Sequence, residues 1–91
     1  MYNTLIVTNK LETFKKRLIY RASYRGTKEM DILLTSFVNK YIKQLDEEAL
    51  LELEIFLNFE DEMLLNFYNN NIATKKIHEN KFSKLFKNHE I

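Results

Sequence analysis

Arg25, Glu29 and Asp31 are the side chains best suited to chemistry in this sequence, and they lie close together along it. Arginine offers a rigid fork of N–H donors, and the two carboxylates accept strong charged hydrogen bonds. Gly26, the only glycine of the chain, stands among them and permits a sharp turn. The pattern predicts a projecting corner that presents charged groups, and the free N–H groups of a helix start, to a partner.

A structural interpretation of the same residues stays open. Gly26 would then only end a helix, and Glu29 would pair with Arg25 across the turn. Such an exposed ion pair contributes about 0–1 kcal/mol, so it would add little to the stability of the turn.

The rest of the sequence offers little that could carry catalysis. His78 and His89 have no carboxylate or cysteine partner at a metal-ligand spacing, so we interpret both as surface or core-edge residues. A single glycine cannot build a phosphate-cradling loop, and the lack of cysteine excludes zinc–thiolate sites, disulfides and thiol nucleophiles. The acidic groups Glu47-Glu48 and Glu60-Asp61-Glu62 fit helix starts, where the helix dipole favours them. We therefore predict no catalytic residue and no metal site.

The apolar spacing predicts the helices that position the turn. From about Asn9 to Ser23, apolar residues recur with the period of one helical face. A wider apolar face from about Lys28 to Lys43 predicts a second, more buried helix. Between them, Gly26 suits the left-handed end of the first helix and Thr27 can cap the second.

Three further helices follow in the prediction. Asp46 is a candidate N-cap for a third helix that carries Leu50 to Leu57 on its apolar face. The acidic residues Glu60 to Glu62 begin a fourth helix, which Asn69 to Asn71 end because asparagine tolerates left-handed geometry. A fifth helix spans about Thr74 to Lys87.

A chain of 91 residues has the length of one domain. We predict an all-α, five-helix bundle that forms a single domain over residues 1–91, with residues 1–8 and 88–91 frayed. No apolar run approaches the roughly 18–20 residues that cross a bilayer. We expect no membrane insertion, and a monomer when the protein is free.

Charge is strongly segregated along the chain, although the net charge is only +1. The formal charge is +6 over residues 1–45, −8 over residues 46–62 and +3 over residues 63–91. Such blocks either orient the molecule on a charged partner or neutralise one another within the fold. The sequence leaves both interpretations open.

The motif at the turn resembles that of the succinate dehydrogenase assembly factor 2 family, the small flavinator proteins. The family pattern is Arg-Gly-x-x-Glu followed by an apolar residue and Asp, and it is matched by Arg25, Gly26, Glu29, Met30 and Asp31. The resemblance extends over about residues 10–87. It includes the apolar second helix, the acidic helix start at Leu45 to Glu48, and the acidic turn before Leu64.

The resemblance implies an assembly factor rather than an enzyme. It would promote covalent attachment of FAD to the flavoprotein subunit of succinate dehydrogenase, with that of fumarate reductase as a second client, by binding and ordering the client. FAD would belong to the client and would not be held tightly by this chain. The residues that the resemblance places at the client contact are Tyr24, Arg25, Gly26, Glu29, Met30 and Asp31, with apolar area from Tyr24 and Met30.

Two other functions remain as alternatives. The basic N-terminal block suits a small helical nucleic-acid-binding protein, but the acidic block would repel phosphate, and we expect no nucleic-acid partner. A regulatory adaptor with a different client fits the composition equally well. Because the N-terminus lacks a signal-peptide pattern, we expect a bacterial cytoplasmic protein, or a mitochondrial matrix protein in a processed eukaryotic form.

Overall fold

The computed structural model describes residues 2–91, with side chains described from Lys10 onward. Over these residues the chain is all-α, as predicted, and contains no strand. The elements, in chain order, are α1 (Tyr2–Ser23), α2 (Lys28–Tyr41), the 3-10 turn η1 (Ile42–Gln44), α3 (Glu47–Leu57), α4 (Asp61–Asn70), α5 (Lys75–Glu79) and α6 (Ser83–Lys87).

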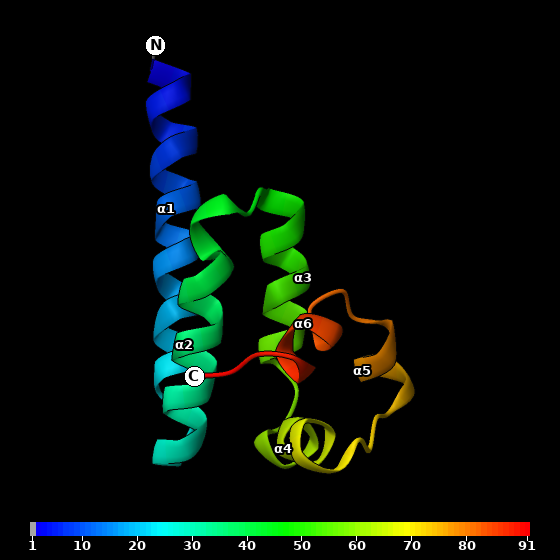
Figure 1. The fold of residues 1–91 in the computed structure, drawn as a ribbon. Coiled ribbons are helices and arrows are strands. Elements are labelled where there is room, and N and C mark those ends of the chain that lie inside the picture. The colour runs from blue at the N-terminus through cyan, green and yellow to red at the C-terminus, as the bar shows by residue number, and fades with distance from the viewer. Residues whose placement is uncertain (1) are drawn as a thin grey trace.

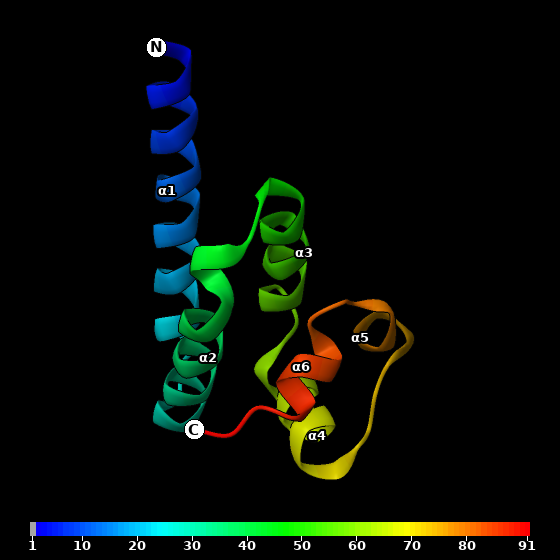
Figure 2. The ribbon, with the colours of Figure 1, turned by 45° about the horizontal axis from the view of Figure 1, so that its top comes forward.

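The helices α1, α2 and α3 form an antiparallel layer in which α1 packs against both α2 and α3, and α4 to α6 gather at the end of the layer where α3 finishes (Figure 1). The chain returns at its C-terminus to α2, and the N-terminal end of α1 extends beyond the other helices (Figure 2). The turn around Gly26 joins α1 to α2, and the turn around Phe59 joins α3 to α4. Both turns lie at the same end of the layer.

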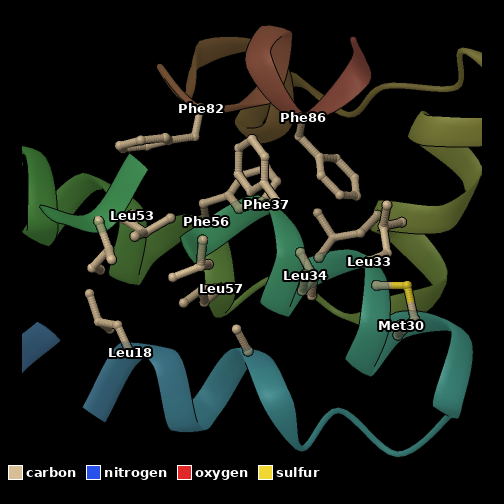
Figure 3. Close-up of a cluster of buried hydrophobic side chains, with 14 of the residues drawn as sticks. Leu18, Met30, Leu33, Leu34, Phe37, Leu53, Phe56, Leu57, Phe82 and Phe86 are labelled. Carbon is tan, nitrogen blue, oxygen red and sulfur yellow. The ribbon is translucent and has the colours of Figure 1, made fainter. Parts of the chain in front are cut away.

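Aromatic side chains join the layer to the C-terminal helices. Phe37 of α2, Phe56 of α3 and Phe86 of α6 are fully buried, and their ring centroids lie 5.2–5.7 Å apart (Figure 3). Rings at these separations and inclined to one another pack favourably edge to face. A short α6 of low intrinsic stability is therefore held in place by a ring from each of two longer helices.

Two helix boundaries differ from the prediction. The first helix begins at Tyr2 rather than near Asn9, since no glycine or proline interrupts the preceding residues. The side chains of residues 1–9 lie outside the described part, so the predicted fraying of residues 1–8 stays a prediction.

The predicted fifth helix is instead divided into α5 and α6 by Asn80. The buried Asn80 side chain accepts a hydrogen bond from the Phe82 N–H at 2.9 Å and donates one to the Glu52 carbonyl at 3.2 Å. These bonds replace helical ones and stop the helix, because asparagine competes for backbone groups.

The C-terminal residues are anchored through His89, which we had expected to fray with residues 88–91. Its Nε2 lies 2.7 Å from the Ser36 hydroxyl, and its carbonyl accepts a 2.5 Å hydrogen bond from the Tyr68 hydroxyl. The ring is only 4% exposed, in line with the predicted core-edge position. Burial, and then the positive charge of Lys40, lower the pKa of His89 below the ordinary value of 6.5.

Candidate functional site

The predicted turn between α1 and α2 is present and has the expected geometry. Gly26 has φ of +118°, a backbone conformation that side chains with a Cβ adopt only with strain. The Thr27 hydroxyl caps α2 by accepting a 3.3 Å hydrogen bond from the Met30 N–H. The half-buried Asp31 accepts a 2.5 Å hydrogen bond from the Arg25 N–H, which closes the turn on itself.

Arg25 does not project from this turn, contrary to our expectation of an exposed fork. Its side chain is only 10% exposed and reaches across to the turn between α3 and α4. The Nε atom donates to Asp61 at 2.8 Å, while Nη1 and Nη2 donate to the carbonyls of Leu57 at 2.5 Å and Phe59 at 2.8 Å. The predicted alternative, an Arg25–Glu29 pair, is not formed.

The local structure of the second turn explains this use of Arg25. The α3 helix ends at Leu57, and the N–H groups of Asn58 and Phe59 donate to the carbonyls of residues 54–56. The Leu57 carbonyl has no such main-chain donor among the described residues. The side chain of Glu60, the N-cap residue of α4, makes no capping hydrogen bond. Arg25 supplies donors to the Leu57 carbonyl and to the Phe59 carbonyl in the turn that follows, and its charge is balanced by Asp61 in the first turn of α4.

The remaining predicted contact residues divide into exposed and buried ones. Tyr24 is 69% exposed, and Gly26 and Glu29 are exposed as well. The Glu29 carboxylate, in the first turn of α2, has no hydrogen-bond or ion-pair partner among the described side chains. Met30 is fully buried in the core, so the apolar area that we expected it to offer a client is not accessible.

An open groove of about 470 Å³ lies between the two turns. Tyr20, Arg21, Tyr24 and Arg25 line it from α1 and its following turn, and Glu60 and Asp61 line it from the start of α4. The exposed rings of Tyr20 and Tyr24 have centroids 4.5 Å apart, at 37° to each other.

The sequence reasoning did not single out Tyr20, Glu60 or Asp61 as site residues. The four-residue spacing of Tyr20 and Tyr24 was a usable signal, because side chains at i and i+4 meet on a helix. No comparable signal linked Arg25 to Asp61, which is 36 residues away along the chain.

The basic and acidic blocks partly neutralise each other beside this groove, which is one of the two interpretations that the sequence left open. Arg17 and Arg21 of α1 approach the Glu54 carboxylate of α3 at 3.5 Å and 3.8 Å. Arg21 also donates to the Asn58 side chain. These pairs, together with Arg25–Asp61, connect α1 and the turn after it to the acidic block, residues 46–62.

The part of the chain that the structure describes holds no cluster of three or more histidine or acidic side chains poised to bind a metal ion. None of the helices described combines the length and apolarity needed to cross a membrane.

Residues 16–90 match the family described as the flavinator of succinate dehydrogenase. The chain belongs to this family. The match includes the motif turn, Arg25 with its three acceptors, the acidic start of α4 and the C-terminal helices.

Curated relatives bear consistent names. A 48-residue stretch, or 53% of the chain, is 44% identical to succinate dehydrogenase assembly factor 2-A, mitochondrial, of Drosophila mojavensis and covers 31% of that protein. The same length and identity hold for succinate dehydrogenase assembly factor 2, mitochondrial, of Saccharomyces cerevisiae strain YJM789, of which 30% is covered. The matched stretch thus spans about a third of the length of these relatives.

Proposed function

We propose that this protein promotes covalent attachment of FAD to the flavoprotein subunit of succinate dehydrogenase, by binding that subunit and ordering it around its cofactor. Membership of the flavinator family, and relatives named as assembly factors of this enzyme, support the proposal. The flavoprotein of fumarate reductase is a second candidate client.

The observation that carries the proposal is the pattern of exposure within the family motif. Glu29 is exposed and unpaired among the described side chains, at a helix start that stabilises a carboxylate without further partners. Beside it, Gly26 leaves the backbone open to close approach, because no described residue other than its two chain neighbours has an atom within 4 Å of where a Cβ would stand. Tyr24 adds an exposed aromatic ring. A charged acceptor, bare backbone and an aromatic ring on one turn suit recognition of a protein surface.

The role we assign to the turn is binding rather than chemistry. Attachment joins the 8α-methyl carbon of the flavin to a client histidine, and the reacting atoms belong to the client. A bound partner raises the rate if it favours the client conformation in which those atoms are aligned. We infer that Glu29 and Tyr24 contribute by favouring that conformation, with the Gly26 backbone in contact.

The proposal carries expectations for cofactor and compartment. We expect the isolated protein to lose FAD during gel filtration, since its single glycine cannot form a nucleotide-binding loop. Purified protein that keeps stoichiometric flavin would contradict this. We expect the protein in the compartment of its client, which would be the mitochondrial matrix in a eukaryote or the cytoplasm in a bacterium; the relatives are named mitochondrial.

The proposal is tested by substituting the exposed carboxylate. Glu29→Ala is made the only copy of the protein in cells, and covalent flavin on the client subunit is measured by in-gel fluorescence. Glu47→Ala is the matched control, because Glu47 is also exposed in the first turn of a helix but lies in α3. We expect flavinylation to fall for Glu29→Ala alone, with both variants melting like the wild type. Full flavinylation by a normally folded Glu29→Ala would remove Glu29 from the site.

The nucleic-acid alternative receives no support from the geometry. Arg17, Arg21 and Arg25 are engaged by Glu54 and Asp61, so three basic side chains of the N-terminal block already have acidic partners. Binding to random duplex with a steep salt dependence would favour this alternative over a protein client.

A further inference from the structure

We propose that Arg25 is a positioning residue of the family motif: it holds the α3–α4 turn against the α1–α2 turn, and the client contacts the surface formed by the two turns rather than the Arg25 side chain. This inference rests on the proposed function and divides the motif into two parts. Arg25 and Asp61 set the relative position of the turns, whereas Glu29, Gly26 and Tyr24 meet the client.

The hydrogen bonds of Arg25 carry the first step. All three guanidinium nitrogens already donate to acceptors within the chain, at 2.5–2.8 Å. The guanidinium carries five N–H groups, so one on Nη1 and one on Nη2 are not used by these three acceptors, but the side chain that carries them is only 10% exposed. Three bonds within the fold and this low exposure leave Arg25 poorly placed for a direct client contact.

The shape of the acceptor set carries the second step. Two main-chain carbonyls and one carboxylate surround a side chain that is 10% exposed. A planar guanidinium reaches three acceptors in fixed directions, whereas a lysine ammonium is a point charge on a flexible stem. The site is therefore built for arginine by groups inside the fold.

The groove between the two turns contains the exposed groups whose relative position Arg25 fixes. Its walls come from separate parts of the chain, with Tyr20 and Tyr24 on one side and Glu60 and Asp61 on the other. Arg25 lies between them and is bonded to the second wall through Asp61. If that bond is lost, the exposed groups of the two turns no longer keep one relative position. A surface that recognises its partner loses rate steeply when its groups are misplaced by about an ångström.

The inference is tested at Asp61, because Asp61 variants keep both bonds from Arg25 to the main chain and should fold. Asp61→Ala removes the acceptor for Nε, whereas Asp61→Asn retains an oxygen that accepts the same bond. In the purified, 15N-labelled protein, the Arg25 Nε–Hε resonance reports this bond without any client. We expect it to move in Asp61→Ala and to stay close to its wild-type position in Asp61→Asn and Glu29→Ala.

Client flavinylation is then measured for the same variants and for Arg25→Ala combined with Asp61→Ala. We expect Asp61→Ala to lower the rate about tenfold or more, Asp61→Asn to restore it, and the double variant to be no slower than Arg25→Ala, since neighbours acting through one contact are not additive.

Full flavinylation by Asp61→Ala would overturn the inference, and so would equal loss in Asp61→Ala and Asp61→Asn, which would assign the charge of Asp61 to the client. A wild-type chain that does not raise flavinylation would instead overturn the proposed function, and this inference with it. The two failures are distinguishable, since only the second involves the unmodified protein.

Discussion

The two turns at the same end of the helical layer are closed in different ways. The α1–α2 turn is closed locally, by the positive φ of Gly26, the Thr27 cap and the bond from the Arg25 N–H to Asp31. The α3–α4 turn has local bonds from the Asn58 and Phe59 N–H groups, but the carbonyls of Leu57 and Phe59 receive their donors from a residue 32 and 34 positions earlier. The first turn is closed by its own groups, whereas the second also depends on its neighbour.

The difference explains why Arg25 affects both turns of the fold. Helix ends must find partners for their orphan groups, and a short turn often finds them in its own side chains. Where it does not, a long side chain from elsewhere supplies them and couples the two elements. The coupling makes the α3–α4 turn sensitive to changes in the α1–α2 turn.

The largest expected effect follows from removing the distant donor. Arg25→Ala leaves two carbonyls without donors and Asp61 without its countercharge, so we expect the free energy of unfolding in urea to fall by about 2–4 kcal/mol. Arg17→Ala is the control, because that side chain is 59% exposed and its ion pair should contribute about 1 kcal/mol or less. Equal losses in the two variants would mean that the α3–α4 turn does not depend on Arg25.

A smaller loss should follow from straining the local closure. Gly26→Ala places a Cβ on a residue with φ of +118°, and we expect a loss of about 1–2 kcal/mol. The cost is conformational, since among the described residues beyond its two chain neighbours none has an atom within 4 Å of a Cβ at this position. Urea unfolding of Gly26→Ala beside Lys28→Ala, an exposed helix-start control, measures it. A loss no larger than that of Lys28→Ala would contradict the strain.

His89 also makes long-range contacts, with Ser36 and Tyr68, and its contribution to stability should depend on pH. The pKa of His89 is lowered in the folded protein, so the unfolded chain binds the proton more tightly. Stability should therefore be unaffected by His89 well above the ordinary value of 6.5 and should fall as the pH drops below it.

His89→Gln should flatten the pH dependence of the melting temperature between about pH 7 and 5. His78→Gln, at an exposed position, is the control substitution. An unaltered slope in His89→Gln would mean that another group controls the acid side.

The smallest stability effect is expected at Glu29, in the locally closed turn. Among the side chains that the structure describes, its carboxylate has no partner and interacts only with the helix dipole, so Glu29→Ala should lower the free energy of unfolding by less than about 1 kcal/mol. Calorimetric melting at neutral pH measures the change. A loss as large as that of Arg25→Ala would make Glu29 part of the fold and return the motif to a structural role.

The same comparison explains how much could be predicted from the sequence. Local closures were predicted correctly, including the Gly26 turn, the caps at Thr27 and Asp46, and the end of the fourth helix at Asn69 to Asn71, where Asn71 is left-handed. Each depends on residue types within a few positions of one another, so the physics is contained in a short stretch.

The distant closures could not be predicted in the same way. The acceptors of Arg25 are brought near only by the packing of α1 against α3, and two of them are main-chain atoms that carry no sequence signal. The burial of Met30 could have been predicted, because Met30 begins the apolar pattern that continues to Leu33, Leu34 and Phe37. The motif led us to assign Met30 to the surface instead. Asn80 divides the last helix through a local bond from the Phe82 N–H and a distant bond to the Glu52 carbonyl, and no local pattern indicates the second.

The acceptors of Arg25 also bear on how sequences of this fold can vary. A main-chain carbonyl is present whatever residue occupies the position, so the bonds to residues 57 and 59 place no demand on the side chains there. Leu57 is instead constrained by its buried position in the core. Only the Arg25–Asp61 contact joins two side chains, so correlated substitution should couple positions 25 and 61 and leave the other two links undetected. Statistical couplings between positions would then detect only the Arg25–Asp61 bond and miss the bonds from the Arg25 side chain to the two carbonyls.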